Sequence, residues 1–232
     1  MSAKSRNETW DFKQLGVLLI FMAITLYFWD SWFVFPVKLF VVLLHEISHG
    51  LMALITGGEI LKIEINENQG GICWHRGGSF FWVASAGYLG SMFWGGLILL
   101  IAAKTKYDSW VMGLIGLSVL LITLLYIRNL YGMGFGILFG VGLLLLARFG
   151  GPTFNDLVLK YIGMTSMLYV IFDIKDDLIS RNISESDASR LGEKYFGNSM
   201  FWGILWLVIA IVYAVIILKF SFNKRIMVGK SF

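Results

Sequence analysis

The chain has 232 residues, of which 57% are hydrophobic and only 15% are charged, and its mean hydropathy is +0.74. Soluble domains average about 25% charged residues, so the composition excludes an ordinary soluble domain. The net charge of +4 is small and forms no dense basic patch, which argues against nucleic acid as a partner. A single cysteine, Cys73, excludes an intramolecular disulfide.

Seven apolar stretches are candidates for membrane spans, because about 20 residues cross a hydrocarbon core roughly 30 Å thick. They lie near 15–33, 34–56, 80–103, 109–127, 130–147, 157–174 and 199–220. The sequence therefore predicts an all-α polytopic membrane protein with six to seven transmembrane helices. We expect a cytoplasmic N-terminal segment at 1–14, a single integral membrane domain at 15–222 and a basic C-terminal tail at 223–232.

Two polar stretches interrupt the spans with regular patterns. In "EILKIEIN" (59–66) polar and apolar residues alternate, which indicates a strand; "NENQGG" has turn chemistry, and "ICWH" is suited to a return strand. The sequence thus predicts a small β-hairpin at 59–78, directly after the second span. In the polar loop 174–198, residues 186–196 are expected to form a short surface helix with Ser186 as its N-cap.

Two spans carry small residues at i, i+4 and i+8, a spacing that lets helices approach closely in lipid. These residues are Gly87, Ser91 and Gly95 in one span and Gly132, Gly136 and Gly140 in the other. Helix packing is the expected role of both stripes, and a place along a substrate path is the alternative.

The second span contains the pattern HExxH within "VVLLHEISHG" (41–50). On a helix, His45 and His49 lie one turn apart on the same face, where both can ligate one zinc ion. Glu46 is about 100° further round the axis and can act as a base toward a metal-bound water. An idle glutamate in an apolar helix would cost roughly 2.5–3.5 kcal/mol, which favours metal binding over an inert hydrogen-bonded cluster.

Catalytic zinc takes three protein ligands and keeps a fourth position open, so one more ligand is needed. The remaining histidine, His75, and three glutamates belong to the polar hairpin segment, where interfacial or solvated roles are expected. Asp173 follows the apolar run 161–172 and ranks first as the third ligand. Asp177 ranks next. Asp176 and Asp177 share the helix face of Asp173, and each could be a ligand, a group that supports the ligand or a solvated residue.

The distribution of charge suggests how the ligands meet. A cytoplasmic N-terminus fits Lys4, Arg6 and Lys13, and the second and sixth spans then run in the same direction. His45, His49 and Asp173 are therefore expected at one depth, toward the cytoplasmic side. With seven spans the basic tail would lie outside, against the positive-inside bias, so either the last segment does not span or an earlier assignment is wrong.

The combination of motifs resembles a known family. HExxHG late in the second span, then "ITGG", a hairpin and "SAGYLG", resembles the site-2 protease superfamily of intramembrane zinc metalloproteases. The segment "FDIKDDLISR…SESDASRLGE" looks like its site-2-protease-like side branch, found in bacteria, plants and fungi. The resemblance covers most of residues 40–195. Two features depart from it: the Asn-Pro turn leading to Asp-Gly is absent, and an extra pair of spans precedes Asp173.

The resemblance implies Zn²⁺ as the cofactor, His45, His49 and Asp173 as its ligands and Glu46 as the catalytic base. It also implies a membrane-anchored protein as substrate and the lipid bilayer as surroundings, with a bacterial inner membrane favoured. The predicted function is intramembrane hydrolysis of peptide bonds. The alternative is a catalytically inactive membrane adaptor or chaperone that retains the site. A metal transporter would need a continuous polar path, and the other spans contain few ionisable residues.

Overall fold

The computed structural model describes residues 12–29, 31–32, 34–175 and 186–223. Its elements in chain order are α1 (Phe12–Tyr27), α2 (Phe35–Ile55), β1 (Glu59–Ile65), β2 (Gly71–Arg76), α3 (Phe80–Lys104), α4 (Asp108–Tyr126), α5 (Leu130–Phe149), α6 (Pro152–Lys175), α7 (Asp187–Lys194) and α8 (Ser199–Phe222). By length and composition, six of these helices can cross a membrane: α2, α3, α4, α5, α6 and α8. The predicted polytopic helical fold with a hairpin after the second helix is confirmed.

The first helix differs from its prediction. The apolar run was expected to span to about residue 33, but α1 ends at Tyr27 and has only 16 residues. It lies along α6, where Thr25 Oγ1 is 3.2 Å from the Tyr161 hydroxyl and the ring of Phe21 faces that of Tyr161. Six spans from α2 to α8 would place the start of α2 and the end of α8 on the same side of the bilayer.

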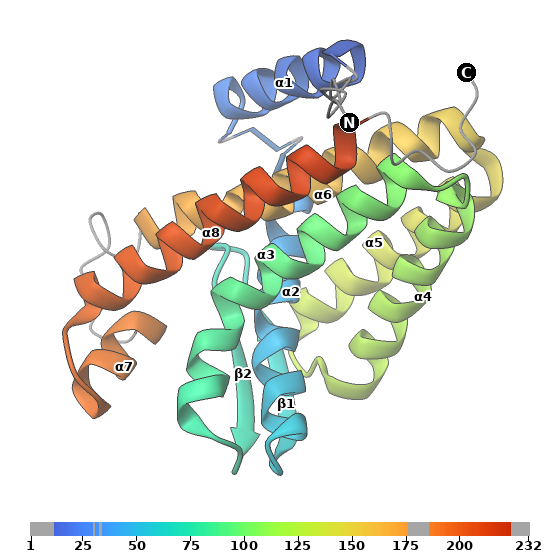
Figure 1. Ribbon diagram of the computed structural model, residues 1–232. Coiled ribbons are helices and arrows are strands. Elements are labelled where there is room, and N and C mark those ends of the chain that lie inside the picture. The colour runs from blue at the N-terminus through green and yellow to red at the C-terminus, as the bar shows by residue number, and fades with distance from the viewer. Residues whose placement is uncertain (1–11, 30, 33, 176–185, 224–232) are drawn as a thin grey trace, which may run out of the picture.

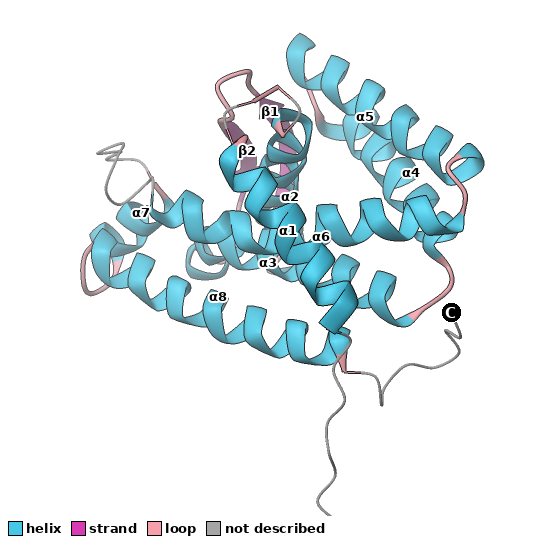
Figure 2. Ribbon diagram, turned by 90° about the horizontal axis from the view of Figure 1, so that it is seen from above, coloured by secondary structure: helices cyan, strands magenta, loops and turns pink. Residues whose placement is uncertain are grey.

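Helices α2 and α3 and the hairpin lie between α4 and α5 on one side and α7 and α8 on the other, with the hairpin at the edge of the molecule (Figures 1 and 2). Small residues make the helix contacts close, as predicted. A Cβ on Gly95 would stand 2.5 Å from the backbone nitrogen of Met167 on α6, and Gly140 packs on Leu120 of α4. The stripe on α5 is therefore explained by packing, whereas Gly87 on α3 has a second role at the site described below.

The hairpin is antiparallel and pairs Glu59 with Arg76 at one end and Ile65 with Gly71 at the other. Its alternation is interrupted by a bulge between Ile60 and Lys62, so Leu61 is exposed although it was expected on the face of Ile63 and Ile65, which are fully buried. A bulge adds one residue to one strand, so the residues before it point to the opposite face from the one that strict alternation predicts.

The outer edge of β1 is closed by the connection between α4 and α5. The side-chain amide of Asn129 accepts from the Ile65 N–H at 3.1 Å and donates to the Ile65 carbonyl at 2.6 Å. The Arg128 N–H donates to the Ile63 carbonyl at 3.1 Å. Both strands pack on α2, and β2 is the strand that lines the pocket of the candidate site.

Candidate metal centre

Helix α2 places the three polar residues of HExxH inside the protein. Glu46 and His49 are buried, with 6% and 8% of their surface exposed, and the His45 side chain is 15% exposed. The imidazole centroids of His45 and His49 lie 4.8 Å apart, as expected for residues one helical turn apart. Both rings therefore present a nitrogen to the same small volume.

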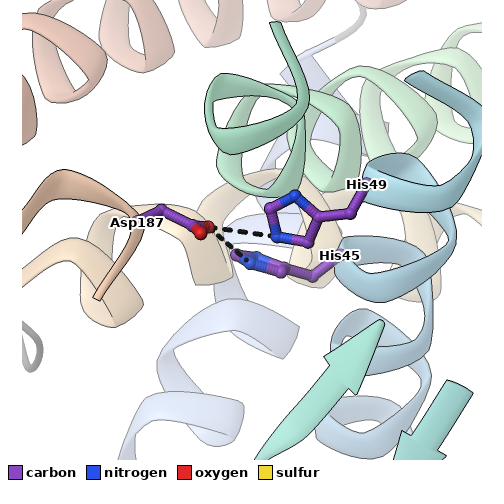
Figure 3. Close-up of side chains that lie close together, drawn as sticks. All are labelled: His45, His49 and Asp187. Atoms are coloured by element: carbon purple, nitrogen blue, oxygen red, sulfur yellow. Dashed lines mark hydrogen bonds and ion pairs between the residues drawn. The ribbon is translucent and has the colours of Figure 1, made fainter. Parts of the chain in front are cut away.

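The carboxylate that meets these nitrogens belongs to Asp187. Its Oδ2 lies 3.2 Å from His45 Nε2 and 3.1 Å from His49 Nε2 (Figure 3). Asp187 is the first residue of α7, which the Ser186 hydroxyl caps by accepting from the Ser189 N–H at 3.2 Å, as predicted. Leu191 of α7 is fully buried in the core that includes α8, so the helix holds Asp187 at the site.

The other imidazole nitrogens have partners of their own. His49 Nδ1 is 2.7 Å from the carbonyl oxygen of Val83, and His45 Nδ1 is 4.0 Å from Asp173 Oδ2. When such a histidine is neutral and keeps its proton on Nδ1, its Nε2 is available to a metal. The structure thus brings Asp173 to the depth of the histidines, as the span count predicted, but on the side of His45 that faces away from Asp187.

Gly87 leaves room beside the two Nε2 atoms. A Cβ at this position would overlap His45 Nε2 and stand 2.5 Å from His49 Nε2. Two imidazoles and a carboxylate form a donor set that suits zinc, and within the described residues His45, His49 and Asp187 are the group that can hold an ion. The residues present therefore fit the metal that the sequence pattern predicts.

Replacing Gly87 with alanine is expected to lower zinc affinity by about 10- to 100-fold, because a methyl group would crowd the ligand nitrogens. Competition with a chromogenic chelator measures the change. Gly142→Ala is the matched control, since an added Cβ there meets nothing within 4 Å. Equal affinities of the two variants would show that the metal does not sit beside Gly87.

Strand β2 fixes Glu46 next to the metal group. The Glu46 carboxylate accepts a hydrogen bond from the backbone N–H of Cys73. A Cβ on Gly71 would stand 2.6 Å from Glu46 Cγ and 2.7 Å from Oε1, so only glycine allows this approach. Glu46 lies outside the ligand group and beside it, which is the arrangement expected of a base.

Two groups that lie outside the membrane helices have altered pKa values. Burial alone would raise the pKa of Asp187, but the charge of His49 and the hydrogen bonds of both histidines outweigh it and hold that pKa below its ordinary value. Burial, and then the charge of Glu46, raises the pKa of the Cys73 thiol to about 12. Asp187 is therefore a carboxylate at neutral pH, whereas Cys73 stays a thiol and is a poor ligand.

The site opens into a pocket of about 310 Å³ between β2, α2, α3, α6 and α7. Ile72 and Cys73 line one wall, and Tyr88 and Arg190 lie on the opposite elements. His75 lies at this pocket on β2 and is partly buried, with its Nδ1 3.1 Å from the Gly77 carbonyl oxygen, in agreement with its predicted place on the hairpin. The metal group is therefore accessible from this pocket.

Sequence reasoning identified two members of the group and missed the third. Asp173 as a ligand stays a prediction, and the geometry favours Asp187 over it; Asp176 and Asp177 lie outside the described residues. One signal could have found Asp187: it is followed by the small residue Ala188, as in the Asp-Gly pattern of the superfamily that the chain resembles.

Comparison with known proteins identifies the family of the chain. The model of the Peptidase M50B-like family matches residues 18–217, a range that contains the complete metal group and the hairpin. No curated protein and no solved structure matches the chain. The family match confirms the resemblance to the site-2 proteases and, with the six apolar helices, a multi-pass integral membrane protein. The chain belongs to the Peptidase M50B-like family.

Proposed function

We propose that the protein is an intramembrane zinc endopeptidase that hydrolyses peptide bonds of membrane-anchored proteins. One observation carries the proposal: Asp187 Oδ2 lies within 3.2 Å of both His45 Nε2 and His49 Nε2, and these histidines and the buried Glu46 belong to a helix that can span the bilayer. Ionisable groups in such a helix mark a functional site by default, because they are costly in hydrocarbon.

His45, His49 and Asp187 would hold the zinc ion, with one position left for water or substrate. When bound, zinc supplies a Lewis acid that polarises the substrate carbonyl and lowers the pKa of a coordinated water to about 7. The Val83 carbonyl would orient His49 through its Nδ1, and Asp173, 4.0 Å from His45 Nδ1, would be an electrostatic partner of His45.

Glu46 acts as the general base and then as the general acid. Its carboxylate takes a proton from the attacking water and returns it to the amide nitrogen that leaves. The Cys73 N–H and the close backbone of Gly71 prevent the side chain from turning away. This rigidity lowers the cost of reaching the reactive geometry.

The substrate must present an extended peptide, because the hydrogen bonds of an intact membrane helix protect its amides. Strand β2 is suited to receive it by strand addition, since Asn129 and Arg128 already occupy the opposite edge of the hairpin. An extended segment beside β2 would lie in the pocket that Glu46 and the histidines line.

Metal removal tests the proposal. Purified protein is incubated with a chelator, and cleavage of a tagged single-span reporter is followed before and after zinc is restored. Cleavage is expected to stop without metal and to return with Zn²⁺ but not with Mg²⁺, which prefers oxygen ligands. Unchanged cleavage by protein shown to be metal-free would contradict a metallopeptidase. Full zinc occupancy without cleavage of any reporter would favour the inactive adaptor.

A further inference from the structure

An apolar groove of about 1060 Å³ lies between α2 and α5, apart from the metal centre. Phe35 and Leu39 form the wall on α2, and Leu138 and Phe149 lie on the α5 side. Both helices can span the bilayer, so the groove opens within the hydrocarbon region. Whatever occupies it is apolar and comes from inside the membrane.

The α5 wall of the groove contains two glycines that pack against nothing. Gly136 and Gly140 face α4, where Thr123 and Leu120 pack against them. Gly134 and Gly142 line the groove instead, and a Cβ at either would meet nothing within 4 Å. Between them Leu138 is 77% exposed. Exposed glycine backbone allows another helix to approach closely, which is how helices associate in lipid.

The groove and the metal centre lie along the same face of α2. Phe35, Leu39, Val42 and Glu46 follow one another at i, i+4, i+7 and i+11, and so share one face of α2. Leu39 is about 10 Å along the axis from Glu46, a distance that about three extended residues cover. On α5 the groove reaches Leu130, next to the Asn129 that binds the hairpin.

We propose that this groove docks the transmembrane helix of the substrate and feeds its unwound end past the hairpin turn to Glu46. The proposal rests on the peptidase function above and names where its substrate binds. The α4–α5 pair supplies no member of the metal group within the described residues, so catalysis alone does not account for it. The pair contacts α2 through the stacked rings of Phe139 and Phe40, and Asn129 binds Ile65 of β1, so it is connected to the elements that form the site.

Photocrosslinking tests the docking. A benzoylphenylalanine replaces Leu138 in the groove or, as control, Leu117, which is 58% exposed on α4 outside the groove. Both carry Glu46→Gln so that a tagged single-span reporter is trapped uncleaved. Capture of the reporter from position 138 but not from 117 is expected. Capture of lipid alone, or of a second copy of this chain, from position 138 would overturn the proposal.

Filling the groove gives an independent measurement. Gly142→Leu is expected to raise the KM for the anchored reporter by about tenfold or more, with zinc content unchanged. Gly16→Leu is the matched control, because an added Cβ on Gly16 in α1 also meets nothing within 4 Å. If Gly142→Leu has the same KM as the wild type while Glu46→Gln is inactive, the docking proposal is overturned and the peptidase proposal is retained. If even the wild type cleaves nothing, the crosslink from position 138 still decides the docking.

Discussion

Replacing Glu46 with glutamine is expected to slow peptide hydrolysis by about 10²- to 10⁴-fold, the usual contribution of a general base. Glutamine has the same size, and its oxygen can still accept from the Cys73 N–H that holds the side chain. It cannot accept a proton from the attacking water. The zinc content should stay at the wild-type level, because Glu46 is not in the ligand group.

The rate is measured on the tagged single-span reporter, with zinc quantified by mass spectrometry in the same samples. Glu64→Gln is the matched control: Glu64 lies on β1 and pairs with Lys62 at 2.7 Å at the surface, where an ion pair contributes little. The control should cleave within about twofold of the wild type. Equal rates for Glu46→Gln and the wild type would exclude Glu46 as the base.

Replacing Asp187 with alanine is expected to give protein without zinc, whereas Asp173→Asn should keep zinc with about 10- to 100-fold lower affinity. The difference follows from position: Asp187 Oδ2 lies between the two Nε2 atoms, and Asp173 faces the Nδ1 of His45 only. Competition with a chelator measures the zinc affinity of both variants.

Glu193→Ala, an exposed position on the same helix α7, controls for loss of that helix and should bind zinc as the wild type does. The opposite pattern, with zinc retained by Asp187→Ala and lost by Asp173→Asn, would restore Asp173 as the third ligand. It would then follow that α7 moves when the metal binds.

Local patterns predicted much of the fold because each rests on short-range physics. Helical spacing brought His45 and His49 to one face, strand alternation and turn residues gave the hairpin, and Ser186 marked the start of α7. Long apolar runs located the spans, although α1 ends at Tyr27, short of the predicted residue 33.

These local patterns did not predict the third member of the metal group. A ligand at membrane depth is expected from hydropathy, which favours Asp173, but Asp187 comes from the polar segment after α6 and reaches the site by tertiary packing of Leu191. Hydropathy cannot distinguish a surface helix from one that folds back onto a buried site. The contact of Gly71 with Glu46 could not be predicted from the sequence either, because it depends on how closely β2 approaches α2.

X-ray absorption at the zinc edge of the purified wild type tests the central claim most directly. The account predicts one zinc per chain with two imidazole nitrogens at about 2.0–2.1 Å and oxygen ligands at about 2.0–2.2 Å, and loss of the ordered site in Asp187→Ala. A sulfur at about 2.3 Å would point to Cys73, and a third imidazole to His75. Either of these, or the absence of zinc, would contradict a centre built from His45, His49 and Asp187.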